Sequence, residues 1–381
     1  MDRSIERLQP VQNTSKKLDS LYHELDDIHQ RIRGEVASVD RVAVVLYNPK
    51  SGNLHTHAES SATTSRFSSY SYPLDACPEL KKCAQHRVTR VIDDIAEKRR
   101  SDKKHANWLV KNSFNSSYTV PLYKGDNFVG FVFYDSHQKA AFSGKVQQQL
   151  AHFSDLICHA VNTEHSLLDA ILCSAELTKE LSPGYKNESK EHMERVSTYA
   201  LLIAKEVADI YDLDDELIEN VHLFSRVHDI GKSTLSSDIL LSPDFLAGLE
   251  RQQIQNYVTD GVIVIDQIIE NLGYPSHRCI EILKEITACH QEFLDGSGYP
   301  NGLVGDEVPI SARIVTVANI FDALTSHRPY KQACSVTSAL LELEKMVWGG
   351  KLDKNCVNAL RNHQQYLADI IRTFPESDPS T

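Results

Sequence analysis

The hydrophobic positions near the N-terminus follow the spacing of an amphipathic helix. Their steps alternate between three and four residues, the a/d spacing of a paired helix, over Leu18, Leu21, Leu25, Ile28 and Ile32. Only two heptads are covered, so the pattern has two interpretations. The helix either packs on its own domain or forms the seam of a dimer.

A strand-rich region follows this helix. Arg41–Tyr47 is a run of β-type residues that ends in a turn at 49–53. Tyr118–Leu122 and Phe128–Tyr134 predict two further strands, joined by a Lys-Gly-Asp-Asn hairpin turn. Glu59–Ser71 is rich in Ser and Thr and predicts a surface loop. Because helical segments lie between and after the strands, this part of the chain has the pattern of an α/β domain.

The pattern then becomes helical and stays so. No proline occurs between Pro121 and Pro183, and apolar residues recur at helical spacing from about Lys145 to Leu181. We expect one long helix that leaves the first domain and enters the second, either as a passive connector or as a transmitter of movement. The later apolar stripes are almost all helical, so the second domain is predicted to be all-α.

Length and composition fit a globular protein of two domains. The chain has 381 residues, a formal net charge of -12 and 24% charged residues. This acidic balance argues against a general DNA or anionic-membrane binder, but is compatible with a local basic pocket for phosphate. The sequence has no apolar stretch of about 18 residues and no apolar core at its N-terminus, so we expect neither a membrane span nor a secretory signal. Eight scattered cysteines suit a reducing compartment, so we expect a cytoplasmic protein.

Histidines and acidic residues mark candidate metal ligands in the second half of the chain. His228 and Asp229 stand side by side where an apolar helical stripe ends, and imidazole nitrogen and carboxylate oxygen both suit transition ions. For that pair alone, a buried histidine bonded to the aspartate is the simpler interpretation. The metal interpretation gains support from His192 at the start of a helix, with Glu188 four residues earlier, and from His290 at the end of a later helix.

A glycine-rich loop with Gly298, Tyr299 and Pro300 follows the last of these histidines. Three glycines around a tyrosine and a proline fix a tight backbone path, and a connection of about 20 residues exceeds what a helix–helix turn needs. We therefore expect a functional loop. Beyond the next helix, Arg328 and Lys331 place two cations where they could hold a phosphate.

These pieces follow one another in a characteristic order: His192–Val196, His228–Lys232, His290–Pro300, Asn319–Thr325 and Arg328–Lys331. With this order and spacing, residues 186–372 resemble the HD-GYP family of HD-superfamily metal-dependent phosphohydrolases. Residues 1–165 look like a GAF sensor domain with an N-terminal helix. The predicted fold class is α+β, with a GAF-like α/β domain joined by a helical linker at 166–185 to an all-α HD domain, and a disordered tail at 373–381.

The resemblance implies a metal centre. Members of this family typically hydrolyse cyclic di-GMP with two or three iron or manganese ions. By position, His192, His228 and Asp229 match metal ligands, with Asp229 as the carboxylate that bridges two metals. Glu188 matches an extra ligand of three-metal members, and His290 matches a retained ligand.

The resemblance also implies roles in binding. Asp229 and Lys232 would act in catalysis, because Lys232 matches the lysine beside the scissile phosphate. Arg328 and Lys331 match residues that hold the other phosphate of cyclic di-GMP or a related cyclic dinucleotide. The Gly298–Pro300 loop could dock a diguanylate cyclase (GGDEF) partner, and a homodimer through the GAF domain and helices is expected.

Three positions depart from the family pattern. Tyr257 stands where the family has a histidine, Gln291 replaces the second histidine of a pair, and Asn319 replaces an aspartate. Gln and Asn offer only a neutral carbonyl oxygen, and a phenol coordinates well only when deprotonated, against a pKa of about 10. Tyr257 and Gln291 would serve mainly the second metal, whereas the first keeps three ligands with Asn319 as a weak fourth. We therefore expect one iron or manganese ion at most.

Three hypotheses about function follow. In the first, the chain is a cyclic di-GMP signalling protein with a degenerate metal site and weak or absent phosphodiesterase activity, acting as a nucleotide-binding or partner-binding regulator. In the second, it is an active metal-dependent phosphodiesterase that yields linear pGpG or GMP. In the third, the second domain is only a scaffold in a GAF-led dimer. We favour the first, because fixed cations can hold phosphate without a paired metal.

Overall fold

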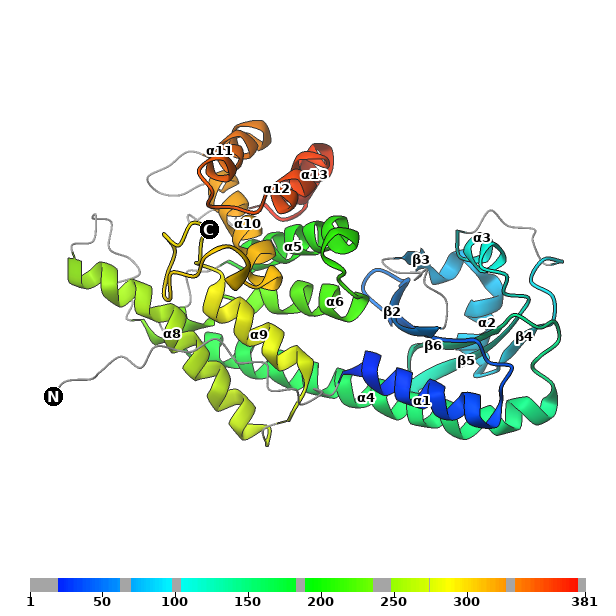
Figure 1. Cartoon of the computed structure of the whole chain (residues 1–381). Coiled ribbons are helices and arrows are strands. Elements are labelled where there is room, and N and C mark those ends of the chain that lie inside the picture. The colour runs from blue at the N-terminus through cyan, green and yellow to red at the C-terminus, as the bar shows by residue number, and fades with distance from the viewer. Residues whose placement is uncertain are drawn as a thin grey trace. The chain divides into compact units, whose positions relative to one another are not determined.

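The structure, a computed structural model, describes residues 20–61, 70–97, 104–182, 189–235, 248–273, 275–326 and 333–375. Two compact units divide the chain, one formed by residues 19–167 with 214–216 and the other mostly by residues 168–213 and 217–381 (Figure 1). The long helix α4, Gly144–Leu181, contributes residues to both units and confirms the predicted continuous helix. The predicted disorder of the tail concerns residues that lie mainly outside the described ranges.

The described part of the first unit holds a six-stranded antiparallel sheet in the order β3-β2-β1-β6-β5-β4. The strands are β1 Arg41–Asn48, β2 Asn53–Ser61, β3 Ser71–Pro73, β4 Arg90–Ile92, β5 Ser116–Lys124 and β6 Asn127–Ser136. The three predicted strands are confirmed. The predicted surface loop begins too early, because Glu59 to Ser61 pair with β1 instead, and residues 62–69 lie outside the described ranges.

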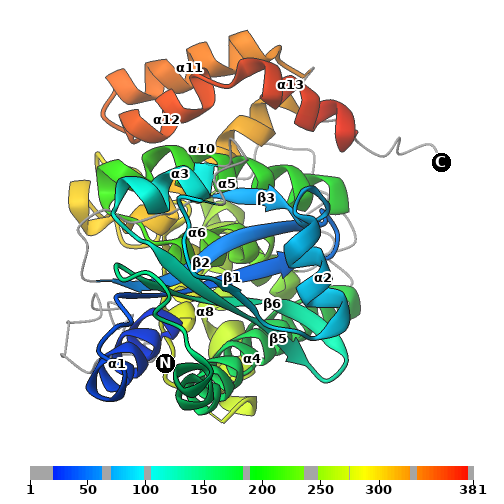
Figure 2. The same cartoon turned by 90° about the vertical axis from the view of Figure 1, so that its right-hand side faces the viewer.

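The two faces of this sheet are covered differently (Figure 2). Helix α1, Leu21–Glu35, and the first part of α4 pack on one face against alternate residues of β1 and β6, including Val42, Val44 and Tyr134. The other face is covered by η1 Leu74–Ala76, α2 Pro78–His86 and α3 Lys104–Lys111. The apolar stripe of α1 is at most 5% exposed, so it packs on its own domain, the first of the two interpretations.

A buried arginine ties three strands of the sheet together. Arg41 on β1 is 1% exposed, and its guanidinium lies 2.6 Å from Asp135 Oδ2 on β6 and 2.7 Å from Glu59 Oε2 on β2. The same guanidinium lies over the ring of Trp108 on α3, 4.9 Å from its centroid. Because a buried charge is tolerated only when it is paired and hydrogen-bonded, this cluster fixes α3 and the strands relative to one another.

The described part of the second unit is helical, as predicted. After the end of α4 it contains α5 Lys190–Tyr211, α6 Asp215–Phe224, α8 Gly248–Asn271, α9 Arg278–Cys289, α10 Ile310–Thr325, α11 Val336–Trp348, α12 Lys354–Arg361 and α13 Gln364–Thr373. Short 3-10 turns lie at η3 Ser225–Val227, η4 Ile230–Thr234 and η5 Gly305–Glu307. Helices α5 and α10 pack side by side at its centre, where the rings of Tyr199 and Phe321 meet edge to face with centroids 5.0 Å apart (Figure 1).

None of the helices in the described ranges is both long and apolar enough to pass through a lipid bilayer.

We predict that Arg41→Met destabilises the first unit by about 3–5 kcal/mol, because it leaves two carboxylates without their buried partner. The double variant Arg41→Met/Asp135→Leu should regain most of this loss, since it removes one orphaned charge as well. Hydrogen exchange of peptides from β1 and β6 in the full chain measures both effects. Wild-type exchange in the single variant would contradict the prediction.

We predict that acid destabilises this unit through His105 on α3. Burial, followed by the charge of Arg41, lowers the pKa of His105 from 6.5 to about 4. Between these values the unfolded chain takes up a proton that the folded chain does not, so stability falls as pH falls from 6.5 to about 4, by up to about 3 kcal/mol. Local hydrogen exchange at pH 7 and pH 5 should show a smaller pH effect in His105→Gln, and an equal effect in both proteins would refute the assignment.

Candidate metal centre

Three separate elements bring the predicted ligands together. Ser189 caps the start of α5 by accepting a hydrogen bond from the backbone N–H of His192, which places His192 in the first turn of that helix. His228 does not end α6 as predicted. That helix stops at Phe224, and the 3-10 turn η3 carries the chain to His228 and Asp229. His290 directly follows α9 at its C-terminal cap, as predicted.

His192, His228 and Asp229 form a compact group of potential metal ligands. One ligand atom from each lies within 4.8 Å of the other two. His228 and Asp229 are buried, with 1% and 2% of their surface exposed, and His192 is partly exposed. Two imidazoles and a carboxylate are a donor set suited to iron, manganese or zinc, so these residues fit one ion.

Each of the three histidines is oriented by a hydrogen bond at its Nδ1 atom. The partners are Asp322 Oδ2 for His192 at 2.7 Å, the Ser225 carbonyl for His228 at 2.7 Å and the Ile286 carbonyl for His290 at 3.0 Å. In the neutral ring, an acceptor at Nδ1 holds the proton there and leaves the Nε2 lone pair for a metal, whereas the protonated ring donates from both nitrogens and can compensate Asp229. The tautomer that metal binding requires is therefore built into the fold.

The structure places Asp322 against the candidate ligand His192, although the sequence motif assigned Asp322 no role. It is 1% exposed and accepts hydrogen bonds from Arg195 Nε at 2.6 Å and from Ser326 Oγ at 3.1 Å, in addition to its bond with His192. Burial alone would raise the pKa of Asp322, but the hydrogen bonds and charges of His192 and Arg195 outweigh burial and lower it. The sequence feature that could have identified Asp322 is its position, one helical turn after Asn319 within the Asn319–Thr325 motif.

Asp229 is the centre of the site. Its Oδ2 lies 2.6 Å from Lys232 Nζ and 3.1 Å from His228 Nε2, and its Oδ1 lies 3.1 Å from His290 Nε2. Burial alone would raise the pKa of this carboxyl, but the positive charges of His228 and Lys232 outweigh burial and hold it well below its usual range. Asp229 is therefore an anion that several cationic or donor groups approach at once.

Tyr257 adds a neutral donor to the same carboxylate. Its hydroxyl donates to Asp229 Oδ1 at 2.7 Å and lies 3.0 Å from His290 Nε2, while Gln291 Nε2 donates to the phenol oxygen at 3.0 Å. Burial, and after it the charge of Asp229, raises the pKa of Tyr257 well above its ordinary value of 10.0. Tyr257 and Gln291, two of the altered positions, therefore form a hydrogen-bonded chain, called the relay below. It ends at Asp229 Oδ1, the oxygen that also faces His290.

A close backbone approach holds Tyr257 against the Asp229 turn. A Cβ atom at Gly231 would lie 1.8 Å from the Tyr257 carbonyl oxygen and 2.6 Å from the backbone nitrogen of Gly261. Only glycine at position 231 lets η4 contact α8 this closely. The phenol is therefore positioned by main-chain packing as well as by its hydrogen bonds.

The glycine-rich loop is held by a buried acid. Glu292, 2% exposed, accepts hydrogen bonds from the backbone N–H groups of Asn301, Gly302 and Leu303 at 2.7, 3.1 and 3.1 Å. A Cβ atom at Gly298 would come within 2.3 Å of the Phe293 backbone nitrogen, so the loop doubles back tightly on itself. The loop that contains Tyr299 and Pro300 is thus ordered by the protein's own contacts.

The remaining predicted site residues are placed only in part. Asn319 lies on α10 and is half-buried, three residues before Asp322. Glu188, Arg328 and Lys331 lie outside the described residues. Their predicted roles stay predictions.

Comparison with known proteins identifies the two domains. A family model described as HD domain matches residues 174–356, and one described as GAF domain matches residues 21–161. The crystal structure of a GAF domain/HD domain protein from Geobacter sulfurreducens is 18% identical and covers 38% of this chain and 93% of that chain, with a TM-score of 0.31, which is too distant to bear on function.

Two curated relatives match about half of the chain each. The cyclic di-GMP phosphodiesterase response regulator RpfG of Xanthomonas campestris is 35% identical over 48% of this chain and 45% of its own length. The 3'3'-cGAMP-specific phosphodiesterase 2 of Vibrio cholerae is 32% identical over 55% of this chain and 38% of its own length. The match thus spans less than half the length of these two relatives. The chain carries a GAF domain followed by an HD domain, and its curated homologues are cyclic dinucleotide phosphodiesterases of the HD-GYP family.

Proposed function

We propose that this chain is a cyclic dinucleotide signalling protein whose HD domain acts as a nucleotide-binding or partner-binding regulator, with weak or absent phosphodiesterase activity. The observation that carries the proposal is the hydrogen bond of 2.7 Å from the Tyr257 hydroxyl to Asp229 Oδ1. This oxygen is the one that faces His290. A carboxylate oxygen that accepts a hydrogen bond from a phenol is a poor bridging ligand for a second metal.

The first metal position retains what a single ion needs. His192 and His228 present Nε2 beside the Asp229 carboxylate, and Asp322 fixes the His192 ring. A bound iron or manganese ion would supply Lewis acidity and would lower the pKa of a coordinated water. Lys232, paired with Asp229 at 2.6 Å, would lie beside a bound phosphate and balance its charge.

The second metal position lacks ligands that two-metal hydrolysis needs. The residues left for a second ion are His290 and a carboxylate shared with Tyr257, because a neutral phenol and an amide replace two imidazoles. The raised pKa of Tyr257 keeps the phenol protonated at neutral pH, so it donates a hydrogen bond where a metal ligand would donate a lone pair. In-line attack then lacks the paired charge that stabilises both the attacking and the leaving oxygen.

Nucleotide recognition rests on other residues. The relatives are named for cyclic di-GMP and 3'3'-cGAMP, and Arg328 and Lys331 retain the cations that would hold a phosphate of such a ligand. The Gly298–Pro300 loop keeps an ordered path through Glu292 and would present the surface for a diguanylate cyclase partner. A homodimer in the cytoplasm is the form in which we expect the protein to act.

One observation favours a second candidate function, an active phosphodiesterase with a one-metal centre. The oriented histidines and the Lys232–Asp229 pair are retained in full, and these are the groups that such a centre would use. Product analysis separates the two functions. A linear dinucleotide formed by the wild-type chain under anaerobic iron or manganese loading, and lost in Asp229→Ala, would establish the enzyme.

We predict that the triple variant Tyr257→His/Gln291→His/Asn319→Asp raises the metal content from about one to about two ions per chain and raises hydrolysis at least about 100-fold. The added imidazoles replace the phenol on Asp229 Oδ1 and the amide that donates to it, and the added carboxylate replaces the neutral amide of Asn319. Elemental analysis and chromatography of the linear product measure the two effects after anaerobic loading. Tyr257→Phe/Gln291→Leu is the matched control, because it breaks the relay without adding a ligand. Two ions per chain and rapid turnover in the wild type would contradict the proposal.

We predict that wild-type protein binds cyclic di-GMP or 3'3'-cGAMP with a Kd below about 1 mM and leaves the ligand intact. Arg328→Ala and Lys331→Ala should each weaken binding about tenfold or more, since each removes a charge-assisted hydrogen bond to phosphate. Lys354→Ala, which removes an exposed cation at the start of α12, should have no effect. Isothermal titration measures the affinities, and the absence of binding for both dinucleotides would exclude the receptor function.

A further inference from the structure

A lysine at the end of α4 is buried, although none of the sequence motifs includes it. Lys179 lies in the last turn of that helix, and only 6% of its surface is exposed. A lysine at a helix C-terminus commonly interacts with the helix dipole from the solvent and keeps its ammonium group hydrated. Because burial of an ammonium group costs free energy unless the hydrogen bonds that it donates compensate, the contacts of Lys179 indicate a specific role.

The ammonium group of Lys179 contacts both chain segments that carry the histidines of the first metal position. Its Nζ donates to the Arg226 carbonyl at 2.7 Å and lies 3.3 Å from Met193 Sδ. Arg226 lies in η3, two residues before His228. Met193 directly follows His192 near the start of α5. One buried cation therefore holds a neighbour of each imidazole.

The same two segments are also joined by a salt bridge. Arg226 Nη2 lies 2.8 Å from Glu194 Oε2, and Glu194 is on α5, two residues after His192. The two side chains are 26% and 34% exposed, so water weakens their attraction. The charge-assisted hydrogen bond from Lys179 is the more deeply buried of the two links, and it holds the main chain of η3 itself.

The position of η3 decides where the His228 ring lies. His228 Nδ1 lies 2.7 Å from the Ser225 carbonyl, and the next carbonyl along the turn, that of Arg226, accepts from Lys179. The rings of His192 and His228 stand with their centroids 6.1 Å apart, at an interplanar angle of 56°. Metal–ligand distances in a well-formed site vary by only about 0.2 Å, so two imidazoles on different elements need a fixed separation to share one ion.

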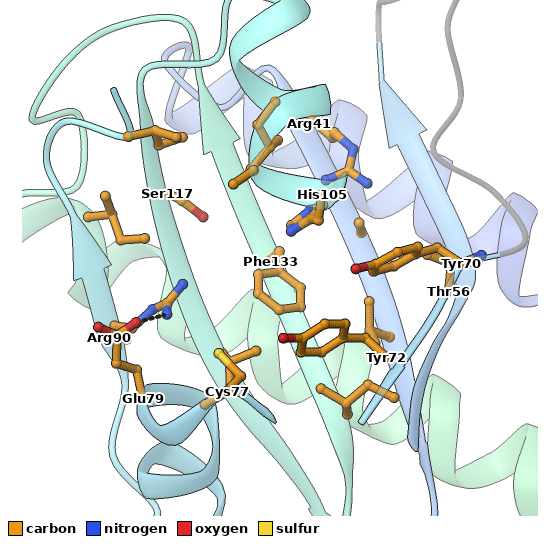
Figure 3. Close-up of a pocket in the computed structure, with 18 of the residues that line it drawn as sticks. Arg41, Thr56, Tyr70, Tyr72, Cys77, Glu79, Arg90, His105, Ser117 and Phe133 are labelled. Atoms are coloured by element: carbon orange, nitrogen blue, oxygen red, sulfur yellow. Dashed lines mark hydrogen bonds and ion pairs between the residues drawn. The ribbon is translucent and has the colours of Figure 1, made fainter. Parts of the chain in front are cut away.

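Cations join secondary-structure elements elsewhere in the molecule as well. In the first unit, Arg90 on β4 pairs with Glu79 on α2 at 3.1 Å and connects this strand with a helix that covers the sheet (Figure 3). There the cation joins two parts of the scaffold. Lys179 differs, because each of the two segments that it joins carries a candidate metal ligand.

We propose that Lys179 is a positioning residue of the metal centre, and that its buried ammonium group fixes the separation of the His192 and His228 imidazoles. The inference rests on the single-ion centre of the proposed function, because these two rings are ligands of that ion. It has a definite sign. A positive charge near a cation site opposes cation binding by repulsion, whereas a positioning contact favours it, so removal of the ammonium group distinguishes the two effects.

The test uses cobalt(II) as the probe, titrated into the metal-free full chain, with calorimetry and the visible absorption bands as readouts. We expect Lys179→Met to weaken cobalt(II) binding by about tenfold or more and to change the bands, as is usual when a side chain that orients metal ligands is removed. Lys179→Arg keeps a cationic donor and should bind more tightly than Lys179→Met. Lys205→Met removes an exposed cation from α5 and should change neither readout. Binding that is unchanged or tighter in Lys179→Met would overturn the proposal.

A readout without metal separates this inference from the function on which it rests. Nitrogen NMR spectra of selectively labelled histidines in the metal-free chain report the tautomer and the surroundings of each ring. The His192 and His228 signals should shift in Lys179→Met, whereas the signal of His363, which lies 3.0 Å from Glu206, should not. If the wild type binds no cobalt(II), the single-ion centre is wrong, and these spectra still decide the role of Lys179.

Lys179→Gln covers the case in which the methionine variant does not fold. The glutamine amide ends one atom short of the lysine ammonium group, so it should lose the contact with Arg226 while keeping a polar side chain in place. The same two ring signals should shift in this variant. His192 and His228 signals at their wild-type positions in a folded methionine or glutamine variant would overturn the proposal, whatever the metal titration gives.

Discussion

The buried carboxylate of Asp229 is the group on which the rest of the HD domain depends. A buried anion is costly unless charges and donors surround it, and here Lys232, His228, His290 and Tyr257 do so. In a two-metal centre much of that compensation would come from the ions. In this chain, the neutral phenol of Tyr257 supplies part of the compensation of the Asp229 charge. This part does not depend on a bound metal.

That substitution is supported by the surrounding structure and is not an isolated side-chain change. Gly231 lets η4 contact α8 at the Tyr257 carbonyl, and Gln291 donates to the phenol from the residue after His290. The phenol therefore has one fixed place and three polar partners, Asp229, His290 and Gln291. These hydrogen bonds also stabilise the fold around the site. Removing them would therefore change the packing of the site as well as its chemistry.

The sequence predicted the order and type of the elements well, because apolar spacing sets which face is buried. The α1 stripe, the strands β1, β5 and β6, and the continuous helix α4 follow from local pattern. The end of α6 was placed wrongly, because periodicity cannot distinguish an α-helix from a following 3-10 turn that keeps the stripe in phase. The motif spacing grouped His192 with His228 and Asp229, yet it gave no role to Asp322, whose importance arises from a contact across 130 residues. Long-range pairing of this kind has no local signature.

The GAF and HD domains follow the same electrostatic rule. In the GAF domain, Arg41 is neutralised by Asp135 and Glu59, and in the HD domain Asp229 is neutralised by Lys232 and hydrogen-bonded by Tyr257. A site binds a charged ligand strongly when it holds an uncompensated charge of opposite sign, and it loses that preference when the protein compensates the charge itself. The proposal of a single metal ion rests on this internal pairing, because the contacts on Asp229 are made by the protein's own side chains. The residue types around a site therefore do not by themselves show which of its charges are left for a ligand.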